Sequence, residues 1–212
     1  MSGDLSFTHR FEPGERTDAV PLLLLHGTGG NENDLIEFGR RIAPTSPLLA
    51  PRGKVLENGM PRFFRRFAEG VFDEEDIRRR AAELADFVAA ARARYGLAAP
   101  VALGFSNGAN IAAAVLLLHP EALAGAILLR AMVSLAAPPR EDLTAKPVLM
   151  ISGQFDPIIP AENALRLAAM LKERGADVGH ETLPAGHGLS QQDIDIASDW
   201  LRDRDGAGQR PG

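Results

Sequence analysis

Short apolar runs alternate along the chain with longer segments in which apolar residues recur at every third or fourth position. A short apolar run bounded by turn residues is typical of a buried strand, whereas the longer recurrence is typical of an amphipathic helix. We predict strands near 20–25, 47–50, 100–105, 124–129, 147–152 and 178–183. The alternation of strands and helices predicts an α/β protein with a mostly parallel, doubly wound sheet flanked by helices.

Two helices are clearest in this pattern. The first is predicted from about Glu74 to Tyr95, with Asp73 placed to cap its start and Gly96 placed to end it. The second is predicted near 191–201, where apolar residues again share one face. This last helix would hold the loop that precedes it against the sheet.

A serine stands in the turn between the predicted strand at 100–105 and an alanine-rich helical stretch. The turn reads Gly104-Phe105-Ser106-Asn107-Gly108. Small residues flank a serine in such a nucleophile elbow because the backbone is crowded where the strand turns into the helix. A Gly/Ser turn is also a common structural connection, so the motif points to acyl transfer only together with its context.

A second glycine-rich turn, Gly27-Thr28-Gly29-Gly30, follows the apolar strand near 20–25. Acyl transfer needs two preorganised donors for the negative oxygen of the tetrahedral intermediate. One usually lies after the nucleophile and one after an early strand, which predicts the main-chain N–H groups of Thr28 and Asn107. A lone glycine cluster would only turn the chain into a helix, but the elbow motif favours an oxyanion hole.

A carboxylate and a histidine follow two later strands. Asp156 stands just beyond the predicted strand near 147–152, and His187 stands in a glycine-flanked loop after the last strand. With Ser106 they give the chain order Ser, Asp, His, which differs from the orders in unrelated serine-protease folds. Three further aspartates compete with Asp156, but they lie in the final helix pattern: Asp193, Asp195 and Asp199.

These four motifs together resemble the α/β-hydrolases of the phospholipase/carboxylesterase family. The resemblance runs from about residue 21 to residue 201 and is strongest to the bacterial carboxylesterase branch that includes hydroquinone-resistance hydrolases. It implies a Ser106 nucleophile, an Asp156 acid, a His187 base and oxyanion amides at Thr28 and Asn107. The branch commonly has a proline where this chain has Ser134, so the loop there is expected to differ in shape.

Length and composition narrow this picture. At 212 residues the chain is short for this fold with a separate cap, so we expect one hydrolase domain over 1–202, without a large cap, and a flexible tail over 203–212. The chain has no cysteine, which excludes disulfides and a cysteine nucleophile, and neither a metal nor a cofactor is predicted. A formal net charge of −5 with interspersed basic residues argues against nucleic acid as a partner.

No apolar run approaches the roughly 18 residues of a membrane span, and the first residues lack the pattern of a secretory signal. We therefore expect a cytoplasmic protein that does not span a membrane. The expected partner is a small-molecule ester. A homodimer stays open, because an exposed apolar edge could support one but no residue pattern establishes it.

Substrate-binding residues are predicted in the segment 57–67, which can loop over the active-site face. There Met60, Phe63 and Phe64 would line an acyl or aromatic slot. The alternative is that the phenylalanines are core residues that anchor a long loop.

Other polar residues have simpler interpretations. Arg62 and Arg65 could attract an anionic substrate, but solvated surface arginines are the more ordinary interpretation. His26 is expected to brace the loop of the oxyanion glycines by hydrogen bonding. Structural roles are predicted for the remaining three histidines: His9, His119 and His180.

The predicted function is that of a serine carboxylesterase that hydrolyses small or medium carboxylic esters through an acyl-enzyme. Two alternatives stay open. The same three residues would serve an acyl thioesterase or lysophospholipase acting on longer chains, which would need a deep apolar groove. A binding protein without turnover is the second, although such proteins commonly lose one of the three residues.

Overall fold

A seven-stranded sheet forms the centre of the protein, and the computed structural model describes residues 5–16 and 18–207. The strand order is β1-β3-β2-β8-β9-β10-β11, and every pair is parallel except β1 with β3. This arrangement confirms the predicted α/β fold, and β1 is an edge strand that we did not predict. In sheet order the strands span His9–Glu12, Leu48–Pro51, Leu22–Leu25, Val101–Phe105, Gly125–Leu129, Pro147–Gly153 and Asp177–Leu183.

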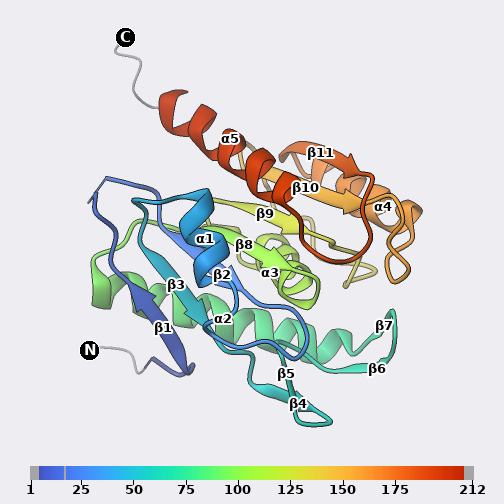
Figure 1. Ribbon diagram of the computed structural model, residues 1–212. Coiled ribbons are helices and arrows are strands. Elements are labelled where there is room, and N and C mark those ends of the chain that lie inside the picture. Colours follow the sequence, from blue (N-terminus) through green and yellow to red (C-terminus); the bar gives the residue numbers. More distant parts are fainter. Residues whose placement is uncertain (1–4, 17, 208–212) are drawn as a thin grey trace.

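Helices cover both faces of this sheet (Figure 1). Helices α1 (Ile36–Ile42) and α5 (Gln191–Ala207) contribute to one apolar core, whereas α2 (Glu74–Tyr95), α3 (Asn107–Leu118) and α4 (Ala161–Lys172) contribute to the other. None of the helices in the described part of the chain is long and apolar enough to cross a membrane.

Strand β2 shows why the predicted strands are continuously apolar. Leu22 and Leu24 pack in the core under α1 and α5, while Leu23 and Leu25 pack in the core under α2 and α3. Successive side chains of a strand point to opposite faces, so a strand covered on both faces needs apolar residues at every position. The carboxyl ends of the parallel strands then meet at one edge, where the glycine-rich turns lie.

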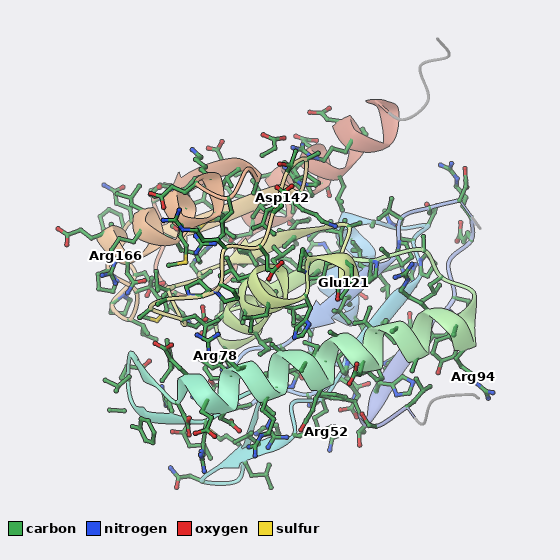
Figure 2. All side chains as sticks on the ribbon, turned by 180° about the vertical axis from the view of Figure 1, so that it is seen from behind. Arg52, Arg78, Arg94, Glu121, Asp142 and Arg166 are labelled. Atoms are coloured by element: carbon green, nitrogen blue, oxygen red, sulfur yellow. The ribbon has the colours of Figure 1, made fainter. Side chains whose placement is uncertain are left out.

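The two predicted helices are present. Asp73 caps α2 by accepting a hydrogen bond of 3.1 Å from the Asp76 N–H, and Gly96 ends it with a left-handed φ of 67°. Figure 2, which views the protein from behind, shows α2 in the foreground, with Arg94 projecting outward near its end. These features confirm the predicted caps.

Helix α5 is longer than predicted, because it continues through Ala207 rather than ending near Leu201. Part of the predicted tail at 203–212 is therefore helical, and residues 208–212 lie outside the described residues. Arg204 supports the extension, since it forms an ion pair of 2.9 Å with Asp177 and stacks on the ring of Trp200.

The segment between β3 and α2 forms two short hairpins, where we predicted a loop. Strands β4 (Val55–Glu57) and β5 (Met60–Arg62) pair antiparallel, as do β6 (Arg66–Ala68) and β7 (Val71–Phe72). The first hairpin turns at Asn58 and Gly59, whose φ angles are 52° and 80°. Positive φ at both central residues is the type I′ geometry that Asn-Gly favours, so this dipeptide was a turn signal that we missed.

Candidate active site

Ser106 lies in a strained turn between β8 and α3, with φ of 53° and ψ of −112°. A non-glycine residue in such a conformation costs about 1–3 kcal/mol and persists only where the surroundings hold it. A side chain at Gly108 would lie 1.9 Å from the Leu25 carbonyl oxygen, and one at Gly104 would lie 2.5 Å from that of Gly108. The two flanking glycines are therefore required by close backbone packing, as the elbow motif predicts.

The structure brings the three residues of the predicted triad together. His187 Nε2 lies 3.0 Å from Ser106 Oγ, and His187 Nδ1 lies 2.8 Å from Asp156 Oδ2. The Asp156 side chain is almost fully buried, and its Oδ1 accepts from the N–H groups of Ile158 and Ile159. With the carboxylate accepting from Nδ1–H, Nε2 is free to accept the serine proton, which is the arrangement that activates a hydroxyl nucleophile.

A buried arginine holds the loop that carries His187. Arg130 donates to both oxygens of Asp193 at 2.7 and 3.0 Å, and both side chains are fully buried. The same guanidinium donates to the carbonyls of Gly186 and Gly188 at 3.1 and 3.0 Å. It therefore binds the backbone on either side of His187, and the carboxylate of Asp193 is committed to this ion pair.

Arg130 and Asp193 are residues that sequence reasoning missed as contributors to the site. Asp193 was considered only as a rival to Asp156, and no role was predicted for Arg130. The available signal was an arginine directly after the apolar strand β9, because a charged side chain in such a position needs a buried partner.

The predicted oxyanion donors lie beside Ser106. Thr28 and Asn107 line the same hollow as Ser106. Within residues 5–16 and 18–207, the main-chain N–H groups of Thr28 and Asn107 have no hydrogen-bond acceptor in the protein, whereas the neighbouring Gly29 N–H donates to Pro61. Two N–H groups without a protein acceptor at one hollow are what an oxyanion hole requires.

His26 braces the glycine-rich loop at 27–30, as expected. Its Nε2 accepts from the Gly53 N–H at 3.0 Å, so Nδ1 carries the proton and donates to the Gly27 carbonyl at 2.7 Å. The side chain is only 2% exposed, and this burial lowers the pKa of His26. The native structure therefore holds His26 in its neutral form.

This burial predicts that the protein loses stability in mild acid. Because the folded state lowers the pKa of His26, the unfolded chain binds the proton more readily below about pH 6.5. The free energy of unfolding should then decrease as the pH is lowered, by at most about 1.4 kcal/mol per pH unit from this residue. Urea unfolding between pH 7.5 and 5.5 measures the slope, and His26→Gln should flatten it; an equal slope in both proteins would contradict this assignment.

Two other histidines have structural partners. His9 bonds to the Phe7 carbonyl and to the Tyr95 hydroxyl, both at 2.8 Å. His180 Nε2 lies 2.9 Å from Ser152 Oγ, which is a second Ser–His hydrogen bond. Among the described residues, no carboxylate bonds to the other ring nitrogen of His180, so this pair lacks the acid of the first.

The predicted substrate-binding residues are only partly placed at the site. Phe63 and Phe64 are 2% and 0% exposed and belong to the core under α2, so they anchor the hairpins and do not line the hollow. Met60 is 41% exposed, and its side chain lies beside Gly29 of the glycine-rich loop at 27–30. The hollow is lined instead by Thr28, Arg62, Arg66, Glu69, Phe72, Ser106, Asn107, Asn110, Met132, Ile158 and Ile159.

Arg62 is buried, which corrects the expectation of a solvated surface arginine. Only 2% of the residue is exposed; it donates to the Phe64 carbonyl at 3.3 Å and to Glu57 at 2.8 Å. Burial lowers the pKa of its guanidinium. Arg65, by contrast, is exposed and pairs with Asp73. The hairpin at Asn58 and Gly59 folds Arg62 inward, and this contact could not be read from the local sequence.

Two further features of the site concern the residue at position 134 and the capacity to hold a metal ion. Ser134, where the family branch commonly has proline, is buried, and its hydroxyl donates to the Asn110 carbonyl at 3.4 Å. No group of three or more His, Cys, Asp or Glu side chains in the described part of the chain could hold a metal ion.

Comparison with known proteins agrees with this geometry. The sequence model of the phospholipase/carboxylesterase family matches residues 9–204. The chain is 43% identical over 197 residues to the putative hydrolase MhqD of Bacillus subtilis, covering 92% of this chain and 98% of that protein.

Two crystal structures of carboxylesterases are similar throughout. The Bacillus cereus carboxylesterase superposes with a TM-score of 0.91 at 40% identity, covering 93% of this chain and 94% of that one. The Mesorhizobium loti carboxylesterase superposes with a TM-score of 0.90 at 35% identity, covering 94% and 96%. The sequence, the fold and the site agree, and the chain belongs to the phospholipase/carboxylesterase family of α/β-hydrolases.

Proposed function

We propose that this protein is a serine carboxylesterase that hydrolyses small or medium carboxylic esters through an acyl-enzyme. The observation that carries the proposal is the continuous hydrogen-bonded chain from Ser106 through His187 to the buried Asp156. It lies at the carboxyl edge of the parallel sheet, in a member of a family of ester hydrolases. The cytoplasm is the proposed compartment, and no cofactor is required for the steps below.

The mechanism follows from the direction of these hydrogen bonds. His187 removes the Ser106 proton as Oγ attacks the ester carbonyl, while Asp156 stabilises the imidazolium that forms. The main-chain N–H groups of Thr28 and Asn107 bind the oxyanion, and one such donor contributes about 3 kcal/mol in comparable sites. His187 then protonates the leaving alcohol. Water activated by the same imidazole hydrolyses the acyl-enzyme and restores Ser106.

One observation favours a second candidate, an acyl thioesterase or lysophospholipase that accepts longer chains. Large apolar side chains are exposed on the two segments that border the hollow, the β6–β7 hairpin and the loop that contains Asp156. They are Phe67, Val71, Phe155 and Ile158. Such residues could support a longer acyl chain outside the hollow.

The two candidates differ in the acyl length that they prefer. We expect turnover of p-nitrophenyl esters, from acetate to palmitate, to be greatest for the short and medium acyl groups, because buried side chains such as Arg62 line the hollow. The measurement is kcat/KM along this series, together with a palmitoyl thioester. A maximum at palmitate, or faster turnover of the thioester, would favour the second candidate.

A covalent label separates either enzyme from a binding protein without turnover. A fluorophosphonate should modify Ser106 in the folded protein, because only a serine activated by its histidine attacks phosphorus rapidly. Mass spectrometry of the peptide that contains Ser106 measures the adduct, and urea-unfolded protein is the control. Equal labelling of folded and unfolded protein would contradict an activated serine.

A further inference from the structure

We propose that the hollow beside Ser106 is an acyl-side subsite for an oxygen acceptor, so that the preferred acyl groups carry a keto or carboxylate oxygen. The inference rests on the proposed function, because it uses the roles of Ser106 and His187 to orient the substrate. It adds the chemical class of the acyl group that the site recognises.

The residues that line the hollow indicate which part of the ester, the acyl group or the alcohol, would occupy it. Ser106, Thr28 and Asn107 line it, but His187 is not among its lining residues. The leaving alcohol must lie against His187, since Nε2 protonates it as the acyl-enzyme forms. With the carbonyl oxygen between Thr28 and Asn107, the acyl group is the part of the ester that extends into the hollow.

Two asparagines of α3, Asn107 and Asn110, line this hollow. Asn107 Oδ1 accepts from the Phe63 N–H at 2.8 Å, and Asn110 Oδ1 accepts from the Met132 N–H at 2.9 Å. A main-chain N–H can only donate, so these bonds identify the oxygen of each amide and leave its NH₂ group on the other side. Residues three apart lie on the same face of a helix, which places both amides along one wall.

Asn107 is the strongest indication that the hollow recognises a hydrogen-bond acceptor. The residue is 3% exposed, and its Nδ2 is buried without any hydrogen-bond partner in the described structure. Buried polar groups in native proteins are nearly always hydrogen-bonded, and those left unpaired often have a ligand or a functional role. An oxygen acceptor on the acyl group would satisfy this donor.

Arg62 adds a third donor to the same lining. Its Nε and Nη1 donate to Phe64 and Glu57, while no hydrogen bond of Nη2 occurs within the described residues. The charges of Arg62 and Arg66 are offset by their ion pairs with Glu57 and Glu69. The four side chains carry no net charge. The subsite therefore selects for a hydrogen-bond acceptor and not for a charge, so a neutral ketone and a carboxylate are both suitable.

Three p-nitrophenyl esters of equal acyl length test the proposal. They are the pentanoate, the 4-oxopentanoate and the hemisuccinate, whose acyl chains are each five non-hydrogen atoms long. The 4-oxopentanoate adds a keto oxygen, and in the hemisuccinate a carboxylate oxygen also replaces the terminal methyl group. The uncatalysed hydrolysis of each ester is subtracted. For the wild type we expect kcat/KM to be about tenfold higher for both oxygen-bearing esters than for the pentanoate, as one added hydrogen bond from a buried donor allows. Equal or greater kcat/KM for the pentanoate would overturn the inference.

Asn110→Asp removes one of the proposed amide donors of the hollow. The aspartate keeps an oxygen for the Met132 N–H but replaces the amide donor with a negatively charged acceptor. The advantage of the 4-oxopentanoate should shrink, because one of the three donors is replaced by an acceptor, and the hemisuccinate should become poorer than the pentanoate, because its carboxylate is repelled. Arg65→Gln is the matched control, since Arg65 is exposed and does not line the hollow, and its selectivity should equal that of the wild type.

The outcomes separate this inference from the proposed function. Turnover of the pentanoate and labelling of Ser106, with no preference among the three esters, would overturn the subsite alone. Selectivity that stays unchanged in Asn110→Asp would also overturn it. Absence of turnover for all three esters, together with absence of labelling, would overturn both proposals. The wild-type comparison decides the question even if Asn110→Asp does not fold.

Discussion

Ser106→Ala is expected to lower kcat for ester hydrolysis by about 10⁴-fold or more, the scale seen when a triad nucleophile is removed. This loss corresponds to about 5 kcal/mol of transition-state stabilisation. The only side-chain hydrogen bond of Ser106 is the one to His187 in the described structure, so the fold should be retained. The measurement is kcat for a p-nitrophenyl ester, with the unfolding midpoint measured in parallel.

Ser152→Ala is the matched control, because this protein contains a second Ser–His hydrogen bond. Ser152 and His180 are 2.9 Å apart, close to the 3.0 Å of Ser106 and His187, but they lack a carboxylate on the other ring nitrogen. Ser152→Ala should keep kcat close to that of the wild type. Comparable losses in both variants, or full activity in Ser106→Ala, would show that Ser106 is not the nucleophile.

Asp193→Asn is expected to destabilise the protein by about 3–5 kcal/mol, because it leaves the fully buried Arg130 without its counter-charge. The substitution also removes an acceptor for the Ser190 N–H and hydroxyl, which both bond to Asp193 at 2.8 Å. For a typical domain stability of about 5–15 kcal/mol, this is a large fraction of the total. Urea unfolding at neutral pH measures the change.

The same substitution should reduce catalysis through the His187 loop. Arg130 binds the carbonyls on either side of His187, and a shift of this loop displaces Nε2 from Ser106. Misplacement by about 1 Å can cost about 10²-fold in rate, so kcat should fall while the folded fraction remains high. Asp195→Asn is the control, since Asp195 is exposed on the same helix. Equal stability and rate in the two variants would refute this role for Arg130 and Asp193.

Much of the fold could be predicted from short-range patterns. The apolar runs identified six of the seven strands of the central sheet, and the Asp73 and Gly96 caps identified α2. The edge strand His9–Glu12 was not predicted because none of its four residues is fully buried, so it lacks the continuous apolar run of the central strands. Helix and strand periodicity, caps and turns depend on residues a few positions apart, which is why a single sequence records them.

The residues of the candidate site likewise divide into those whose place was predicted from local patterns and those whose place was not. Ser106, Asp156 and His187 each stand at a strand end with a recognisable turn, so their positions and order were visible before their hydrogen bonds were known. The burial of Phe63 and Phe64 was not visible, because an aromatic side chain in a glycine-rich segment fits a pocket wall and a core equally well. Contacts with distant segments place both phenylalanines in the core.

Arg130 and Asp193 show where local patterns stop being informative. They are separated by 63 positions, and only the parallel order of β9 and β10 and the packing of α5 bring them together. The inward turn of Arg62 and the unpaired amide of Asn107 arise likewise from contacts between distant segments. Local chemistry was thus sufficient to identify the strands and the turns and to nominate the proposed reacting groups. The supporting ion pair and the wall of the acyl subsite depend on which surfaces meet when the core closes, and no short stretch of sequence contains that information.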